Sequence, residues 1–397
     1  MNIGIYGGTF DPPHIGHIAA AKAAMSALCL DKLLLIPDRI PPHKPLPPGS
    51  PTAEQRLEMV TLASAALGKQ AEVSDMELRR SGVSYTADTL AELHALYPQD
   101  TLYLLMGSDM FLSLQSWHRP QQVMALAHIA PFSRRQADEG DAFAAQKALL
   151  ERDYGARITL ISNPGVVELS STQVRTALAQ GGGEELLPPA VWGYVQRRSL
   201  YGVRTDLKHL TPDALRPVAL SYLKPKRMPH VLGTESEAVR LARRYGADET
   251  QARVAALLHD CTKKLDMAQQ LALCAQYGIR LDELERKALK LLHSKTGAAV
   301  ARDVFGVEDA VYDAILYHTT GKPDMTLLEK IIYLADYIEP TRDFPGVDVL
   351  RRTVYEDLDR GLLMGLTMTV EEMEEMGSPV HHMTRDARDY LLKRGIR

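Results

Sequence analysis

The stretch NIGIYGGTFDPPHIGH, residues 2–17, decides the fold of the first half of this 397-residue chain. It opens with β-forming residues and passes through a double glycine into IAAAKAAMSAL at 18–28, which is typical of a helix. KLLLIP at 32–37 follows as a second strand, and TLYLLM at 101–106 and RITLI at 157–161 predict further strands. Strands that alternate with helices in this way predict a parallel α/β sheet.

The segment between the first strand and the first helix is suited to binding a polyphosphate. Gly7 and Gly8 have no Cβ, so a ligand can approach the backbone, and Thr9 offers a hydroxyl. His14 and His17 lie on one face of a helical turn whose exposed N–H groups favour an anion. Two histidines alone are more often structural residues. Together with the double glycine, they favour a triphosphate site that is neither a GxxxxGK[ST] loop nor a GxGxxG turn.

GGTFDPPHIGH at 7–17 resembles the signature of nucleotidyltransferases with an HxGH motif. The first half as a whole is similar to the bacterial nicotinate mononucleotide adenylyltransferases, through PPHK at 41–44, SYTADTL at 84–90, GSDMFLSLQSWH at 107–118 and LSSTQVR at 169–175. This resemblance implies a doubly wound parallel sheet. It also implies transfer of AMP from ATP to nicotinate mononucleotide with Mg²⁺, giving nicotinate adenine dinucleotide and pyrophosphate.

The same resemblance implies roles for individual residues. His14, His17 and Arg175 are expected to be the catalytic cationic groups, because this chemistry depends on positioning and on charge stabilisation. The residues expected to bind ATP or nicotinate mononucleotide are Gly7, Gly8, Thr9, Phe10, Lys44, Tyr85, Thr86, Gly107, Ser108, Asp109, Trp117, Ser170, Ser171 and Thr172. Some of these positions also have a simpler interpretation, since Asp109 and the serines are typical helix caps and a lone Trp is usually a core residue.

A proline-rich segment interrupts the first half. IPDRIPPHKPLPPGSP at 36–51 has seven prolines in sixteen positions, which excludes a helix or a central strand. Composition alone is typical of a linker, but the segment lies between a strand and a helix opened by the capping-box pattern Thr52-x-x-Gln55. A long stiff loop at such a place is expected to cover a substrate, with Lys44 closing over the phosphates.

The second half has a different pattern. Strand signals stop near Leu200, and from about Asp213 apolar periodicity predicts helix after helix. The intervening SLYGVRTDLKHLTPD, which contains Gly202 and Pro212, is typical of a domain boundary. We therefore predict an α/β domain over residues 1–202, followed by an all-α helical bundle over 203–397.

Six candidate metal ligands are distributed over the helical half: His230, His259, Asp260, His293, His318 and Asp336. Each histidine alone is more often an ordinary helix residue. However, Asp260 ends the apolar run ARVAALLH and Asp336 interrupts IIYLADYI, where an unpaired carboxylate costs several kcal/mol. Mixed imidazole and carboxylate ligands suit Fe, Mn, Co, Ni or Zn better than Ca, and we favour Fe or Mn. With Asp260 as a bridge, the set is sufficient for one ion or for two.

RMPHVLGT at 227–234, LLHDCTKK at 257–264 and LYHTTGKPDMTLLEKIIYLADYIEPTR at 316–342 resemble the HD-domain phosphohydrolases, and among them the symmetrical diadenosine tetraphosphate hydrolases. The resemblance implies metal-assisted hydrolysis of this dinucleotide to two ADP, with Asp260 and Lys263 taking part in catalysis. Thr320 and Lys322, like Lys263, lie next to ligand motifs and are candidates to hold phosphate oxygens, although a solvated surface position explains them equally well.

Alternatives to both assignments stay open. Class I aminoacyl-tRNA synthetases also carry HIGH, but this chain has no KMSKS-like run and no space for an anticodon-binding domain. The helical half is alternatively a nucleotide phosphomonoesterase, or a metal-stabilised regulatory module that hydrolyses nothing.

Composition narrows the class of protein further. Lys and Arg number 46 against 50 Asp and Glu, and neither half is net positive, so bulk binding to nucleic acid or an anionic membrane is not expected. The three cysteines form no CxxC pair, which suits a reducing compartment, and neither a targeting signal nor a membrane-spanning stretch is visible. We expect a cytoplasmic enzyme that acts on ATP, nicotinate mononucleotide and dinucleoside polyphosphates. Its oligomeric state, homo-oligomer included, stays open.

Overall fold

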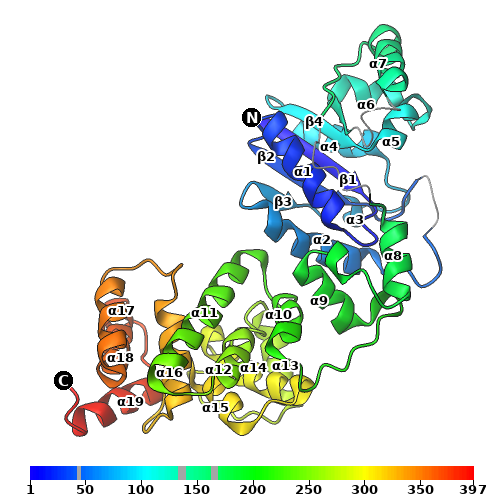
Figure 1. Cartoon of the computed structure of the whole chain (residues 1–397). Helices are drawn as coiled ribbons and strands as arrows, with labels where there is room; N and C mark the ends of the chain where they lie inside the picture. Colours follow the sequence, from blue (N-terminus) through cyan, green and yellow to red (C-terminus); the bar gives the residue numbers. More distant parts are fainter. Residues whose placement is uncertain (43–45, 133–139, 162–168) are drawn as a thin grey trace. The chain divides into compact units, whose positions relative to one another are not determined.

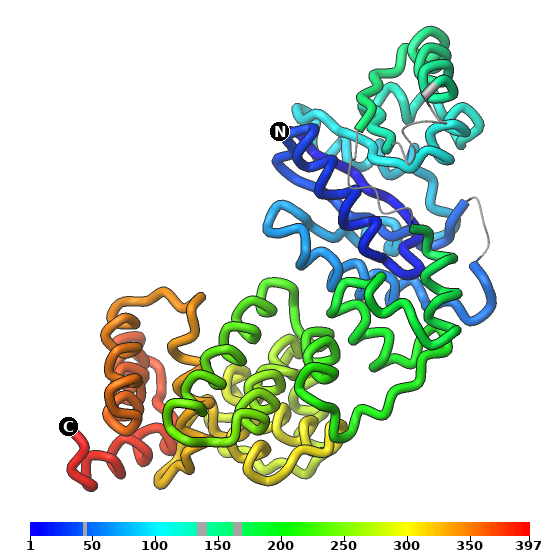
Figure 2. The backbone as a smooth tube through the Cα atoms, in the orientation of Figure 1, coloured from blue at the N-terminus to red at the C-terminus, as the bar shows by residue number. Residues whose placement is uncertain are grey.

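The computed structural model describes all residues except 43–45, 133–139 and 162–168 (Figure 1). Its contacts divide the chain into two compact units, Met1–Arg204 and Thr205–Arg397. Figure 2 traces the backbone of both units. The first is an α/β domain and the second is helical, as predicted. The division falls two residues beyond the boundary expected at 202/203.

A parallel sheet with strand order β3-β2-β1-β4-β5 forms the centre of the first unit. Its described strands are β1 (Asn2–Gly8), β2 (Lys32–Pro37), β3 (Ala71–Val73), β4 (Thr101–Met106) and β5 (His128–Pro131). The chain leaves β1 toward β2 and β3 on one side and returns to β4 on the other, so the sheet is doubly wound. Ligands of such sheets bind beyond the carboxyl ends of the strands where the order reverses, here between β1 and β4.

Helices cover both faces of this sheet, because alternate strand residues are apolar on each side. Ile3 and Ile5 belong to the core that includes Leu90 of the fourth helix, whereas Leu33 and Leu35 belong to a second core with Ala24 of the first. The described helices of this unit are α1 (Ile15–Ala27), α2 (Ala53–Ser64), α3 (Met76–Arg79), α4 (Thr86–Leu96), α5 (Ser108–Leu112), α6 (Pro120–Leu126), α7 (Gly140–Tyr154), α8 (Ser171–Ala179) and α9 (Pro189–Arg198). Short 3-10 turns lie at Ala65–Leu67, Leu114–Ser116, Glu184–Leu186 and Leu200–Gly202.

The predicted strand at 157–161 is wrong in detail. Ile158 and Ile161 form two isolated parallel bridges to Ile129 and Phe132 instead of a continuous strand. The amide of Thr159 donates to the carbonyl of Ile129, and that of Ile161 donates to the carbonyl of Pro131. The bond that would link these two bridges needs an N–H at residue 131, which proline lacks. One residue of β5 therefore interrupts the ladder.

The second unit consists of helices around a single large apolar core that includes Leu241, Ile332 and Leu366. Its described α-helices are α10 (Pro212–Leu220), α11 (Met228–Tyr245), α12 (Glu249–Leu258), α13 (Met267–Gln276), α14 (Leu289–Phe305), α15 (Asp309–Tyr317), α16 (Leu327–Ile338), α17 (Val347–Glu356), α18 (Leu358–Glu375) and α19 (His382–Lys393). A 3-10 turn at Pro225–Arg227 precedes α11. Among the described residues of the whole chain, no helix combines the length and apolar character needed to cross a membrane.

Candidate functional sites

The Gly7–His17 segment lies where the sheet topology predicts a ligand. Gly7 and Gly8 are the last residues of β1, and His14 is the N-cap of α1. The His14 and His17 rings lie 3.7 Å apart between centroids at an angle of 35°, so the structure brings the two histidines together. The backbone N–H of His14 donates to Nδ1 of His17 over 3.1 Å. A neutral His17 therefore carries its proton on Nε2, as a donor suited to a phosphate oxygen.

Helix α8 joins this segment from far along the chain. Ser170 caps α8 through a reciprocal capping box with Gln173. The Ser171 hydroxyl donates to the carbonyl of Pro12 over 3.0 Å, and Nη1 of Arg175 donates to the carbonyl of Asp11 over 2.6 Å. Two loop carbonyls thus hold the beginning of α8 against the histidine-bearing loop. This contact places the Arg175 guanidinium on the loop that leads to His14.

Arg175 is also fixed by its own helix, because its Nη2 donates to the hydroxyl of Thr172 over 3.0 Å. The carboxylate of Asp11 lies 3.6 Å from the same guanidinium and is 2% exposed. Asp11 accepts hydrogen bonds from Ser50 over 3.0 Å and from Tyr201 over 2.7 Å. This buried carboxylate therefore connects the loop, the end of the proline-rich segment and the end of the unit.

The remaining predicted positions surround the same edge of the sheet. Gly107 directly follows β4 and is the N-cap of α5, whose first residues are a buried Ser108 and an exposed Asp109. Because β4 pairs with β1 up to Tyr6 and Leu105, these residues and Gly7 occupy adjacent strand ends. Phe10 is buried, and its ring lies 5.1 Å from the His17 ring at 61°. We interpret Phe10 as packing under the histidine pair.

The predicted pyridine-binding residues form a separate group. Tyr85 is the N-cap of α4, so Thr86 is the first residue of that helix. The Tyr85 ring stacks on the ring of His118, with centroids 4.2 Å apart and 28° between planes. Trp117 is partly buried and packs against the core on this side of the sheet. Lys44, predicted to close over the phosphates, lies outside the described residues.

Sequence reasoning missed a buried ion pair that contacts Thr9 in the Gly7–His17 segment. Arg56 of α2 is fully buried, and its Nη1 donates to the carbonyl of Thr9 over 2.8 Å and to Asp38 over 2.9 Å. The Thr9 hydroxyl donates to the other Asp38 oxygen over 2.7 Å. Burial raises the pKa of Asp38, although Thr9 and Arg56 oppose that shift. An Arg at a helix position that periodicity assigns to the core was the available signal.

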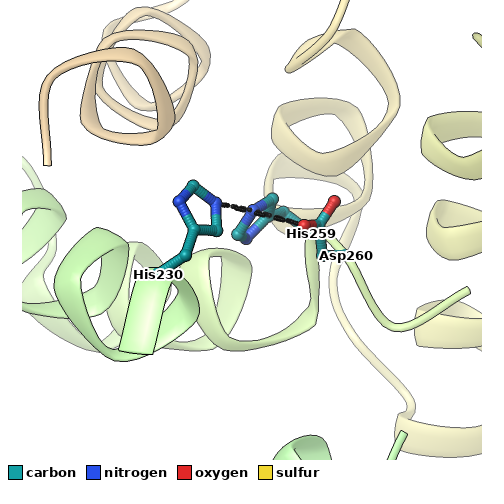
Figure 3. Close-up of side chains that lie close together, drawn as sticks. All are labelled: His230, His259 and Asp260. Atoms are coloured by element: carbon teal, nitrogen blue, oxygen red, sulfur yellow. Dashed lines mark hydrogen bonds and ion pairs between the residues drawn. The ribbon is translucent and has the colours of Figure 1, made fainter. Parts of the chain in front are cut away.

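The six predicted metal ligands of the second unit converge at the ends and inner faces of five helices. His230 lies in the first turn of α11, and His259 and His318 are the C-caps of α12 and α15. Asp260 follows His259, His293 lies on α14 and Asp336 lies on α16. Figure 3 shows His230, His259 and Asp260 pointing into the same space.

Asp260 lies between two groups of ligands. On one side, its Oδ2 is 3.5 Å from Nε2 of His259 and 4.0 Å from Nε2 of His230. Oδ1 of Asp336 completes this group at 3.0 Å from Nε2 of His230. On the other side, Oδ1 of Asp260 is 3.2 Å from Nε2 of His293 and 4.0 Å from that of His318. Each group contains donor atoms within 4.8 Å of one another, so the donor set fits one or two cations.

Contacts around the ligands fix the direction in which the imidazoles point. Nδ1 of His259 lies 2.6 Å from the carbonyl of Ala256, and Nδ1 of His318 lies 2.7 Å from that of Ile315. A carbonyl only accepts, so both rings carry their proton on Nδ1 and turn an unprotonated Nε2 inward. Nδ1 of His230 has an equivalent acceptor in the fully buried Glu339, at 3.0 Å. Sequence reasoning missed Glu339, which lies three residues beyond Asp336.

The two aspartates are ionised. Burial alone raises a carboxyl pKa, but His259, His293 and Lys263 together outweigh it and hold the pKa of Asp260 well below its usual range. Burial also opposes ionisation of Asp336, but His230, His259 and Arg342 together outweigh it and hold the pKa of Asp336 well below its usual range. Arg227 donates to Asp260 over 2.5 Å, and Arg342 donates to Asp336 over 2.5 Å. Sequence reasoning also missed these two arginines, which place two positive charges in contact with the aspartates of the cluster.

The three residues predicted to hold phosphate, Lys263, Thr320 and Lys322, do not all contact the six-ligand cluster. Nζ of Lys263 lies 3.0 Å from Nε2 of His293 and 3.9 Å from Asp260, so it belongs to the cluster. Thr320 donates its hydroxyl to the carbonyl of Gly321, and Lys322 pairs with the buried Glu329 over 3.0 Å. The contacts of these two side chains in the described structure are therefore with their own segment rather than with the six ligands.

Two family models match the chain: the cytidylyltransferase-like family over residues 5–177 and the HD domain over residues 227–341. A "probable nicotinate-nucleotide adenylyltransferase" from Shewanella sp. (strain MR-7) is 40% identical over 215 residues, which cover 51% of this chain and 99% of the relative. Its counterpart from strain MR-4 is 41% identical over the same shares. These relatives correspond to the first half of the chain alone.

Solved structures match each half. One described as a "predicted HD superfamily hydrolase involved in NAD metabolism", from Clostridium acetobutylicum, is 42% identical over 47% of this chain and 98% of that one, with a TM-score of 0.45. A nicotinic acid mononucleotide adenylyltransferase from Plasmodium falciparum, complexed with NaAD, is 20% identical over 51% of this chain and 98% of that one, with a TM-score of 0.43.

The fold and the two sites define a nucleotidyltransferase unit followed by a metal-binding HD domain. Within that class, the chain belongs, through its first half, to the nicotinate-nucleotide adenylyltransferase family, fused here to the HD domain of its second half. The resemblance stated from the sequence is confirmed at this level.

Proposed function

We propose that the first unit, which contains the α/β domain predicted over residues 1–202, transfers AMP from ATP to nicotinate mononucleotide. The 5′-phosphate oxygen of the mononucleotide forms a bond to the α-phosphorus of ATP, and the bond from that phosphorus to the bridging oxygen breaks. The products are nicotinate adenine dinucleotide and pyrophosphate. The observation that carries the proposal is the convergence of His14, His17 and Arg175 at the β1–β4 strand ends.

Each residue of this set has a role that its position supports. The His17 Nε2–H and the Arg175 guanidinium donate to phosphate oxygens, so negative charge that develops on the pyrophosphate is met by cationic or N–H groups already in place. The amides at the beginnings of α1 and α8 add donors of the same kind. Mg²⁺, when bound with ATP, supplies further charge neutralisation. Tyr85, Thr86 and Trp117 are proposed to hold the pyridine ring, with Tyr85 already stacked on His118.

The test of this activity is an assay of the full chain with ATP and either nicotinate or nicotinamide mononucleotide. We expect dinucleotide and pyrophosphate in equal amounts, with nicotinate mononucleotide preferred. Amino-acid-dependent pyrophosphate exchange would instead indicate the synthetase alternative. Failure to form a dinucleotide from either mononucleotide would refute the proposal for this unit.

For the second unit, which corresponds to the helical domain predicted over residues 203–397, we propose symmetrical hydrolysis of diadenosine tetraphosphate. Water adds its oxygen to a phosphorus beside the central bridging oxygen, the bridge to that phosphorus breaks, and two ADP result. The proposal is supported by the two ligand groups on either side of Asp260, since a purely structural ion needs four ligands and no open position. The six ligands would hold Fe or Mn, and such an ion would lower the pKa of water and so favour nucleophilic attack at neutral pH.

The chain's own residues prepare this site for a polyphosphate. Arg227, Lys263 and Arg342 are 27%, 35% and 31% exposed in their side chains, so each reaches solvent while contacting an acidic ligand. A polyphosphate is a suitable partner for such groups because guanidinium and phosphate pair in a bidentate manner.

Product analysis separates the candidate activities of the second unit. Two ADP from diadenosine tetraphosphate support the proposal. Free phosphate from mononucleotides, without dinucleotide cleavage, supports the phosphomonoesterase, and absence of turnover in the metal-loaded chain supports the regulatory module.

A further inference from the structure

A second cluster of potential metal ligands lies apart from the six-ligand site. A cavity of about 490 Å³ in the second unit is lined by Leu291, Ser294 and Lys295 of α14 and by His381 and His382 at the beginning of α19. The three α14 residues share one face of the helix, because they are three and four positions apart. His293, which faces the six-ligand site, lies on another face of α14.

Asp282 and Glu285 lie in the wall of this cavity, and one oxygen of each carboxylate accepts a hydrogen bond from a backbone amide. The amide of Asp282 donates to Oε2 of Glu285 over 2.9 Å, and the amide of Glu285 donates to Oδ1 of Asp282 over 2.8 Å. The remaining oxygens, Oδ2 and Oε1, each lie 3.4 Å from Nε2 of His381. Turn geometry therefore fixes both carboxylates with one oxygen toward the same imidazole.

His381 is the unusual member of this cluster. Its side chain is 5% exposed, and its Nε2 is buried without a hydrogen-bond partner in the described structure. The adjacent His382 brings its Nδ1 to 3.7 Å from Oδ2 of Asp282. A buried nitrogen and two further potential ligand atoms thus converge within 4.8 Å of one another, next to the Lys295–Glu285 ion pair.

We propose that Asp282, His381 and His382 bind a divalent transition-metal ion, with solvent from the cavity completing the coordination. Tetrahedral N and O ligands at about 2.0–2.1 Å from an ion lie about 3.3–3.4 Å from one another. The observed 3.4 Å and 3.7 Å match this spacing closely. Two imidazoles favour Zn²⁺, Co²⁺ or Ni²⁺ over Mg²⁺ and Ca²⁺.

Three neighbouring features lower the affinity of this site. Lys295 pairs with Oε1 of Glu285 over 2.5 Å, so the negative charge of Glu285 neutralises the charge of Lys295 rather than that of the ion. The beginning of α19 carries partial positive charge, which opposes a cation. Binding also moves the His381 proton to Nδ1, which gives up the 3.3 Å hydrogen bond from the amide of Met383. We therefore expect weaker binding here than at the six-ligand site.

Equilibrium dialysis of the full chain against Co²⁺ tests the proposal. Asp282→Asn keeps the oxygen that caps the turn but removes the charged ligand, and His382→Asn changes a side chain that is 64% exposed, so neither variant should unfold the unit. Each should bind one equivalent of Co²⁺ fewer than the parent chain. The lost equivalent should carry the intense visible absorption of tetrahedral Co²⁺.

Matched controls are His94→Asn, at an exposed residue of α4, and Asp348→Asn, whose side chain is 80% exposed. Both should bind as much Co²⁺ as the parent. A second comparison uses His259→Ala, in which the six-ligand site is damaged: Asp282→Asn should again remove one equivalent. Unchanged Co²⁺ binding in both cavity variants, or equal losses in the controls, would overturn the proposal without affecting the proposed hydrolysis.

Discussion

The two sites proposed for this chain differ in the electrostatic means by which they would bind phosphate. The site at the β1–β4 strand ends is built from imidazoles, a guanidinium and helix amides, which attract an anion directly. The site of the second unit is built around two ionised aspartates, which attract cations first. Under the proposed functions, the first site would bind ATP largely through its own groups, whereas the second would be complete only with metal. Substitutions should therefore separate the two activities cleanly.

The largest expected effect is that of Asp260→Asn. The substitution keeps one oxygen but removes the charge between the two ligand groups. We expect diadenosine tetraphosphate hydrolysis to fall on the order of a thousandfold, with loss of bound metal, while adenylyl transfer stays within about twofold. Metal analysis and both assays on the same preparation measure this, and Asp348→Asn is the matched control. Equal loss of both activities would contradict the separation.

The next effect concerns stability of the first unit. Arg56→Met leaves Asp38 as a buried charge without its partner and should cost about 3–5 kcal/mol of unfolding free energy. Both tryptophans, Trp117 and Trp192, lie in this unit, so their fluorescence during urea unfolding reports on it alone. Arg79→Met, at a side chain 68% exposed, should change little. A similar loss of unfolding free energy in both variants would show that the buried ion pair stabilises the unit no more than an exposed arginine does.

Predictability from sequence also differs between the sites. The first was predicted because Gly7, His14 and His17 lie in one continuous string between a strand and a helix. What sequence did not reveal was Arg56 and Asp38 beneath Thr9, because a hydrogen bond between residues 18 positions apart has no local pattern. Likewise, the interrupted ladder at 157–161 depends on a proline in its neighbour, Pro131.

In the second unit the ligands themselves were predictable, because Asp260 and Asp336 interrupt apolar runs that otherwise have no use for a charge. Their grouping was not. Which oxygen of Asp260 faces His259 and which faces His293 depends on how five helices pack. Glu339 and Arg342 follow the end of α16, where charged residues are ordinary, so only their contacts reveal them.

A smaller but still decisive effect is expected at His17. His17→Ala removes the Nε2–H donor and the ring stacked on His14, so adenylyl transfer should fall about a hundredfold or more, with hydrolysis unchanged. His94→Ala is the control, and circular dichroism checks that α1 is retained. Full activity of the His17 variant would contradict the proposed phosphate site, and a loss in the control would point to a general effect of removing histidine.

The smallest effect tests whether the surroundings of the metal ligands matter. Glu339→Gln preserves shape but places an amide where a carboxylate accepts from Nδ1 of His230 and from the amide and hydroxyl of Thr341. Metal affinity should fall about 10–100-fold, since a carboxylate behind an imidazole raises its basicity and fixes its direction.

A matched Glu237→Gln variant distinguishes this effect from general disturbance of α11. Glu237 is also buried on that helix but accepts from Tyr355 instead. If both variants lose metal equally, packing of α11 explains the loss. If only Glu339→Gln loses it, the carboxylate acts through His230. Hydrolysis at saturating metal should then recover in Glu339→Gln but not in Asp260→Asn, because the first still has every ligand and the second has lost the one that lies between both groups.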